Sequence, residues 1–151
     1  MEKIGIERDI WIDAPQERVW DAITDPVQIG KWFAPGVTFK TSGEGVGTRL
    51  YVEDPETGAE LYTQIVEVYT PPHELITRTV AEPPEIPYTT TWKLASENGG
   101  TRLTLIHAGY EADPADVRKE KMQQNGTGFT AMMENIKAHI EGYELPTPGG
   151  F

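Results

Sequence analysis

The side chains that titrate closest to neutral pH are the imidazoles of three histidines, and the chain has no cysteine. His73 follows a Pro-Pro pair, while His107 and His139 lie in a strand-like and a helix-like segment, so their spacing matches no metal-ligand set. His73-Glu74 begins like the HExxH motif, but Thr77 takes the place of its second histidine. We therefore predict no metal and no other cofactor. Because no acid–base pair can be assembled from the remaining residues, the sequence favours binding over enzymatic catalysis.

His107 is the titratable residue with two open interpretations. Alternation along the segment 101–108 places it on the same face as Leu103 and Leu105. If that face is turned to the interior, His107 is either a polar anchor or general base at the rim of an apolar cavity, or a structural residue with a local hydrogen-bond partner. The absence of an Asp or Ser companion favours the structural interpretation.

Aromatic, aliphatic and sulfur-bearing side chains around that face form a candidate ligand site. Trp92 and Leu94 share a face and make either a cavity wall or a filled core. Trp32 and Phe33 lie at the end of a helical corner. They are either aromatic residues at the mouth of a cavity or ordinary packing residues that fill the corner. The tyrosine hydroxyls could orient a ligand oxygen, and the methionines could adapt to its shape. The candidate ligand-binding residues are Trp32, Phe33, Tyr62, Trp92, Leu94, Leu103, Leu105, His107, Tyr110, Phe129, Met132 and Met133.

A long amphipathic helix near the C-terminus is the element that must position several of these residues. Apolar residues recur at helical spacing from 129 to 140, which predicts a helix over Gly128–Glu141 that ends at Gly142. Asn135 falls on its polar face. Helical structure is also expected from Asp113-Pro114 onward, with a kink or loop at 125–128, and we expect the Pro- and Gly-rich tail 145–151 to be loose.

Short strands account for most of the remaining chain. Alternation predicts strands at 4–12, 37–41, 48–53, 59–70, 74–81, 88–96 and 101–108. Arg8 interrupts the apolar stripe of the first strand. Pro15 and Pro26 mark the starts of two short helices, the second extending to about Lys31. The glycines at 43, 45 and 47 predict a turn, because a phosphate loop would need a lysine and a following helix. A proline-rich loop is expected at 82–87 and a hairpin turn at 97–100.

Length and charge limit the class of protein. The 151 residues suit one domain, 1–151. A net charge of −11, with 24 acidic and 13 basic residues, repels nucleic acid and anionic lipid surfaces, although it would suit a basic protein partner. The N-terminal residues do not resemble a signal peptide, and no run of about 18 apolar residues occurs. We expect a cytoplasmic protein without membrane insertion.

Two sequence stretches resemble a known superfamily. DAPQERVWDAITDPVQIGKWF (13–33) and GGTRLTLIHAGY (99–110), together with the Gly-Phe pair at 128–129, are similar to the START-like, or SRPBCC, branch named after the activator of the heat-shock-protein ATPase. Phe129 stands where that branch commonly has tryptophan, and the segment 66–72 is one residue longer than usual. The resemblance implies an α+β helix-grip fold. In this fold, a curved antiparallel sheet of six to seven strands wraps around the long C-terminal helix, and two short helices follow the first strand.

Two functions remain open at this level. One is the binding of a hydrophobic small molecule, such as a lipid, a polyketide or another aromatic compound, in a cavity between the sheet and the C-terminal helix. The alternative, implied by the resemblance, is a stress-response interaction module that acts on a heat-shock chaperone ATPase. We expect a monomer or a weak homodimer in either case.

Overall fold

Seven strands and three helices make up the described part of the chain. The computed structural model describes residues 4–34, 36–80, 87–111 and 113–151. The elements are β1 (Ile6–Ile12), α1 (Gln16–Thr24), α2 (Pro26–Phe33), β2 (Phe39–Thr41), β3 (Arg49–Glu53), β4 (Glu60–Thr70), β5 (Glu74–Thr79), β6 (Thr89–Glu97), β7 (Gly100–Ala108) and α3 (Ala115–Glu141).

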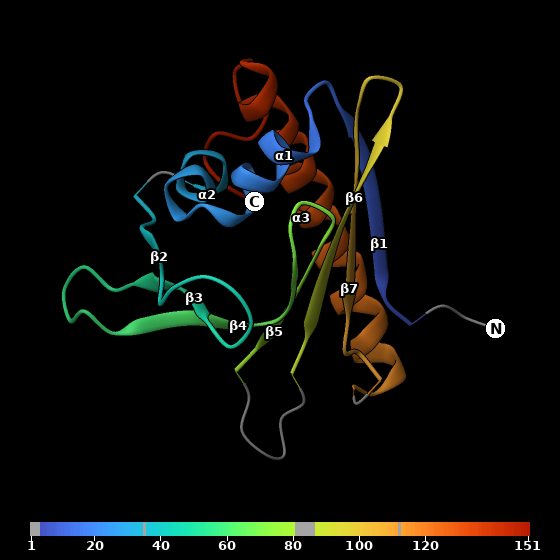
Figure 1. Ribbon diagram of the computed structural model, residues 1–151. Coiled ribbons are helices and arrows are strands. Elements are labelled where there is room, and N and C mark those ends of the chain that lie inside the picture. Colours follow the sequence, from blue (N-terminus) through green and yellow to red (C-terminus); the bar gives the residue numbers. More distant parts are fainter. Residues whose placement is uncertain (1–3, 35, 81–86, 112) are drawn as a thin grey trace.

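The strands form one antiparallel sheet in the order β1-β7-β6-β5-β4-β3-β2. The long helix α3 runs beside β1 and β7, whereas α1 and α2 cover one end of the sheet, and β2, β3 and β4 extend to the side (Figure 1). The curved, unclosed sheet and the long C-terminal helix confirm the predicted α+β helix-grip fold. The strand predictions hold to within a few residues, while the loop expected at 82–87 lies mostly outside the described residues.

Local signals explain why the chain turns where it does. The Asp25 side chain accepts a hydrogen bond from the Val27 N–H (3.0 Å) and Pro26 occupies the first turn, which starts α2 directly after α1. Between β6 and β7, Asn98 and Gly99 have φ values of 48° and 79°, as a type I′ turn requires. The hairpin loop is therefore two residues long, and Glu97 already pairs with Gly100.

The predicted kink at 125–128 is wrong, because α3 continues unbroken through 27 residues. Gly126 is buried in this helix, and a Cβ atom there would lie 2.5 Å from the Arg8 guanidinium. Arg8 stands opposite Leu105 in the β1–β7 ladder, and its Nε donates to the Thr130 hydroxyl (3.0 Å). Glycine at position 126 therefore leaves room for the Arg8 side chain from β1. No local sequence pattern indicates this contact.

The C-terminal tail is held by a buried amide, which overturns the expectation of a loose tail. Asn135 is fully buried, although the helical pattern placed it on the polar face. Its Nδ2 donates to the carbonyls of Thr147 (2.8 Å) and Trp32 (3.0 Å), and its Oδ1 accepts from the Thr147 N–H (2.9 Å). The Phe151 ring also packs on Phe33, with ring centroids 5.2 Å apart. These contacts join the tail to α2 and α3.

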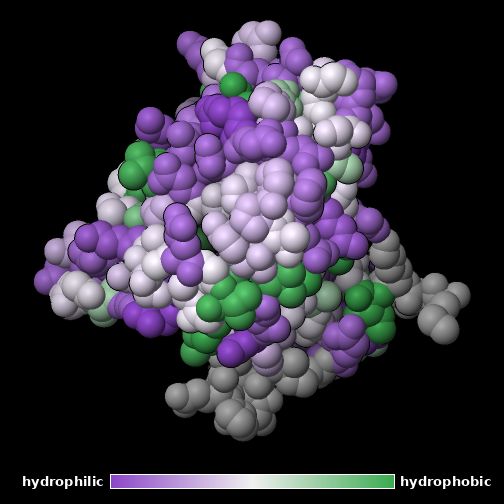
Figure 2. Space-filling model, viewed as in Figure 1, coloured by the Kyte–Doolittle hydropathy of each residue, from purple (hydrophilic) through white to green (hydrophobic). Residues whose placement is uncertain are grey.

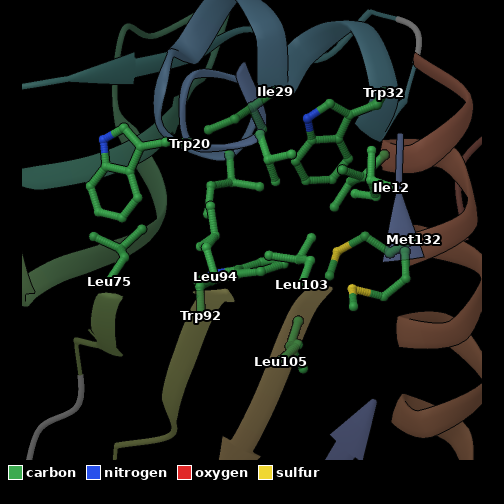
Figure 3. Packing of buried hydrophobic residues seen from close by; sticks show 14 of the residues in the cluster. Ile12, Trp20, Ile29, Trp32, Leu75, Trp92, Leu94, Leu103, Leu105 and Met132 are labelled. Atoms are coloured by element: carbon green, nitrogen blue, oxygen red, sulfur yellow. The ribbon is translucent and has the colours of Figure 1, made fainter. Parts of the chain in front are cut away.

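The hydrophobic core fills the space between the helices and the central strands. Leu103 and Leu105 of β7 have no exposed surface and face Met132 and Met133 of α3 within one buried cluster. In Figure 3, Met132 lies beside Leu103, while Trp20 lies at the opposite side of the cluster. The part of the interior next to α3 is thus packed with side chains.

Candidate functional site

A cavity of about 380 Å³ lies where the helical corner meets the sheet. Its lining comes from α1, from the α1–α2 junction, from the end of β2 and the connection that follows it, and from β3, β4 and β5. The described lining residues include none from α3. The cavity therefore differs in position from the one expected between the sheet and the C-terminal helix.

One wall of the cavity is apolar and aromatic. Trp20 and Leu75 are only 5% exposed and face each other at one side of the buried cluster (Figure 3). Leu75 pairs with Tyr69 across the β4–β5 ladder, so these two side chains lie next to each other on one face. The Tyr69 ring meets the Trp20 ring edge-on, with centroids 5.4 Å apart. Val66 and Leu50 continue the apolar surface along β4 and β3.

Hydroxyl groups are the polar component of the inner surface, and their hydrogens are already engaged. The buried Thr77 donates to the Gln64 side-chain oxygen (2.5 Å). Thr24 donates to the Trp20 carbonyl and Thr48 to the Gly45 carbonyl, both at 2.7 Å. Their oxygen atoms keep acceptor capacity, so these threonines can accept a hydrogen bond from a ligand.

The opening of the cavity is acidic. Asp21, Asp25 and Glu44 all line it and are all exposed. None of the described residues that line the cavity is a lysine, an arginine or a histidine. The field at the opening is therefore negative.

The connection between β2 and β3 brings Glu44 to the cavity. Gly45 and Gly47 have φ values of 90° and 88°, which side chains with a Cβ rarely adopt, so glycine is needed at both positions. The Gly47 N–H donates to the Val66 carbonyl (2.8 Å), and the Val66 N–H donates to the Thr48 carbonyl (2.9 Å). The predicted glycine turn is thus fastened to β4, with Glu44 and Gly45 at the cavity.

A second polar cluster, separate from the cavity, surrounds His107 at the C-terminal end of β7. The Asn125 amide donates to the Tyr110 oxygen (2.9 Å), and the same hydroxyl lies 2.5 Å from His107 Nδ1. If the hydroxyl donates to Nδ1, the proton of the neutral imidazole is on Nε2. Tyr88 stacks on the His107 ring at 5.3 Å, and Phe129 lies 4.8 Å away on centroid distances. Burial lowers the pKa of His107 to about 4, so the ring is uncharged at neutral pH.

Two kinds of feature are not found among the described residues, namely a metal-ligand group and a membrane-spanning helix. No group of three or more His, Asp or Glu side chains in this part of the chain could hold a metal ion. No helix in the described segments combines the length and the apolar character needed to cross a bilayer.

Comparison with known proteins relates this architecture to a family. Residues 13–141 match the family model described as Activator of Hsp90 ATPase homolog 1-like protein (Aha1-like). The chain belongs to this family. The match covers the helical corner, most of the sheet and α3, and it confirms the resemblance seen in the sequence. A search of curated protein sequences finds no significant match to this Aha1-like chain.

Solved structures share the Aha1-like fold at low sequence identity. CalU16 from Micromonospora echinospora aligns over 90% of this chain and 75% of its own, with a TM-score of 0.67 and 24% identity. DynU16, from the dynemicin biosynthetic locus, aligns over 93% of this chain but only 48% of its own, with a TM-score of 0.69 and 18% identity. The Aha1 dimer from Colwellia psychrerythraea aligns over 92% and 97%, with a TM-score of 0.70 and 18% identity. These likenesses show the fold alone.

The twelve candidate residues of this Aha1-like chain do not gather at the cavity. The structure distributes them between the packed core, the His107 cluster and the surface. Tyr62 is 85% exposed on β4, and the indole N–H of the buried Trp32 donates to the Ala22 carbonyl (2.8 Å). Seven belong to the buried cluster, namely Trp32, Trp92, Leu94, Leu103, Leu105, Met132 and Met133; Phe33 and Phe129 pack against it, and His107 and Tyr110 are buried beside it.

His107 thus has the local hydroxyl partner that the structural interpretation requires, whereas a contact between any of the twelve residues and a ligand stays a prediction. The cavity residues were missed although their elements were predicted. Trp20 and Leu75 belong to an apolar helix face and to a predicted strand, but the sequence carries no local signal that they border a void. The distance between the helical corner and the sheet creates the cavity, and that distance depends on long-range packing.

Proposed function

We propose that this Aha1-like protein binds a small hydrophobic molecule in the cavity beneath the α1–α2 corner. The supporting observation is a volume of about 380 Å³ with an apolar wall formed by Trp20, Tyr69 and Leu75. Volumes of about 300–1,000 Å³ are typical of small-molecule sites, which combine apolar walls with placed polar groups. The ligand classes that suit it are an aromatic compound, a polyketide fragment or one chain of a lipid.

Apolar burial alone supports modest affinity. A ligand that loses about 300 Å² of apolar surface gains roughly 7 kcal/mol at about 25 cal/mol per Å². Immobilising it costs about 4 kcal/mol or more, and the remaining roughly 3 kcal/mol corresponds to a Kd in the millimolar range. Micromolar binding therefore requires contributions from the polar groups of the site.

The fold comparisons are compatible with this role. DynU16 comes from the dynemicin biosynthetic locus and shares the fold at 18% identity. This origin in a biosynthetic locus supports small-molecule binding as a class.

A cavity-filling substitution tests the proposal. Leu75→Trp places an indole in the cavity and should abolish binding of a hydrophobic fluorescent probe. The matched control is Ile76→Trp on the opposite face of the same strand, which should leave binding unchanged. Retained binding in Leu75→Trp, combined with loss in Trp92→Ala or Phe129→Ala, would move the ligand to the residues beside α3. Native mass spectrometry of the protein purified from its own host would show which molecule is bound.

The alternative function is docking to a heat-shock chaperone ATPase in a stress response, and membership of the Aha1-like family favours it. The face in Figure 2 is mainly hydrophilic, with apolar residues in small separate groups, so docking there would depend on polar contacts. An increased chaperone ATPase rate, without any small-molecule binding, would support this function. The Aha1 dimer of Colwellia psychrerythraea also makes a homodimer a proposal to test by light scattering.

A further inference from the structure

We propose that the ligand of this cavity is a cation: a hydrophobic amine or ammonium compound whose charge lies at the opening and whose apolar part lies against Trp20 and Leu75. The inference rests on the proposed binding function and adds the charge of the ligand. It follows from three features of the same cavity, namely the sign of the charges at its opening, the absence of cations from its described lining, and its aromatic inner surface.

The carboxylates at the opening have no cation partner among the described residues. No lysine or arginine of the described segments forms an ion pair with Asp21, Asp25 or Glu44. The cations on the adjacent strands are engaged with other carboxylates: Lys40 of β2 with Glu53 (3.3 Å) and Arg49 of β3 with Glu60 (2.9 Å).

The three carboxylates differ in their availability. Asp25 accepts the hydrogen bond that caps α2, so part of its charge is engaged by the N-terminus of that helix. Asp21 and Glu44 approach the cavity from different directions, one from α1 and one from the β2–β3 connection. An ammonium group at the opening would therefore lie between carboxylates of two separate elements, beside low-dielectric walls that strengthen the field.

The aromatic rings suit the apolar part of the same ligand. Trp20 and Tyr69 both line the cavity and can pack against an aromatic body. A carboxylate ligand, such as a free fatty acid, would meet repulsion from the acidic opening and from the net charge of −11. A neutral ligand would gain only the apolar contacts. The three classes of ligand should therefore bind in the order cation, neutral compound, anion.

A matched ligand series tests this order. Isothermal titration calorimetry at pH 7 and low salt would compare 2-naphthylmethylamine, 2-naphthylmethanol and 2-naphthoate, which share one aromatic body and differ in charge. We expect the amine to bind about tenfold more tightly than the alcohol, and the carboxylate at least tenfold more weakly. Added salt should reduce the difference, because the carboxylates at the opening are exposed.

Variants assign the preference to the opening. The double substitution Asp21→Asn with Glu44→Gln should remove the difference in affinity between the amine and the alcohol. The control, Glu56→Gln with Glu111→Gln, removes two exposed carboxylates that do not line the cavity and should keep the full preference. Thermal unfolding would verify that both double variants are folded.

The outcomes separate the two proposals. If the alcohol binds and the amine binds no more tightly, or if the double variant keeps the preference, the cationic-ligand inference is overturned while cavity binding stands. If no member of the series binds, cavity binding itself fails, and the inference fails with it.

Discussion

Acidification should destabilise the protein through His107 in a pH range above the one in which carboxylates titrate. Burial lowers the pKa of this imidazole from 6.5 to about 4 in the folded state. The unfolded chain therefore takes up a proton as the pH falls through about 6.5, whereas the folded protein does not until about pH 4. The free energy of unfolding consequently decreases over this window as the pH falls, and it is fully retained above pH 7.

The magnitude follows from the two pKa values. Each pH unit between them contributes about 1.4 kcal/mol, so the loss between pH 7.5 and pH 5.0 is roughly 2 kcal/mol. The rings around His107 carry no charge that would oppose this effect: Tyr110, Tyr88 and Phe129 surround it. The hydroxyl of Tyr88, whose ring stacks on His107, contacts both Asp113 (3.2 Å) and Lys121 (3.4 Å).

Urea unfolding of the wild type and of His107→Gln at both pH values measures this linkage. The wild type should lose about 2 kcal/mol more than the variant, since glutamine does not titrate. His73→Gln serves as a control at an exposed histidine and should behave as the wild type does. Equal losses in the wild type and in His107→Gln, within about 0.5 kcal/mol, would refute the assignment of a buried neutral imidazole.

Two further substitutions probe the long-range contacts of α3. Gly126→Ala should be neutral or destabilising in the wild type but should stabilise the protein by about 1 kcal/mol in an Arg8→Ala background, because the new Cβ then no longer meets the guanidinium. Urea unfolding of the wild type, both single variants and the double variant would measure the coupling between the two positions. Strictly additive changes in the free energy of unfolding would contradict this contact. Asn135→Ala should cost about 2–3 kcal/mol and increase hydrogen exchange at the Thr147 amide, while unchanged exchange there would show that the tail is held by other contacts.

Local sequence signals were sufficient for most of the fold. Period-two alternation, the proline helix starts and the Asn-Gly turn depend on residues within one element or one loop, so the strands, the α1–α2 corner and the β6–β7 hairpin could be predicted. The errors arose at α3, where Gly126 and Asn135 have partners far away in the sequence. The side chain of Arg8, which lies across Gly126, is 122 positions from its hydrogen-bond partner Thr130. No local pattern could identify such partners.

The candidate site shows the same limit. The aromatic and aliphatic residues on the predicted inner faces do point inward, but most of them fill the core. Trp20 and Leu75 have the same local pattern as their packed neighbours, and only the three-dimensional placement of the corner above β4 and β5 leaves space beside them. Glu44 lies in a glycine turn whose role in the cavity depends on its attachment to Val66.

The central claim is tested most directly by mapping a bound neutral ligand on the folded protein. A titration with 2-naphthylmethanol, followed by amide chemical shifts in a ¹⁵N-labelled sample, should give saturable changes at Trp20, Val66 and Leu75 and none at His107, which does not line the cavity. Changes confined to the surroundings of His107, or no saturable change at all, would contradict the account.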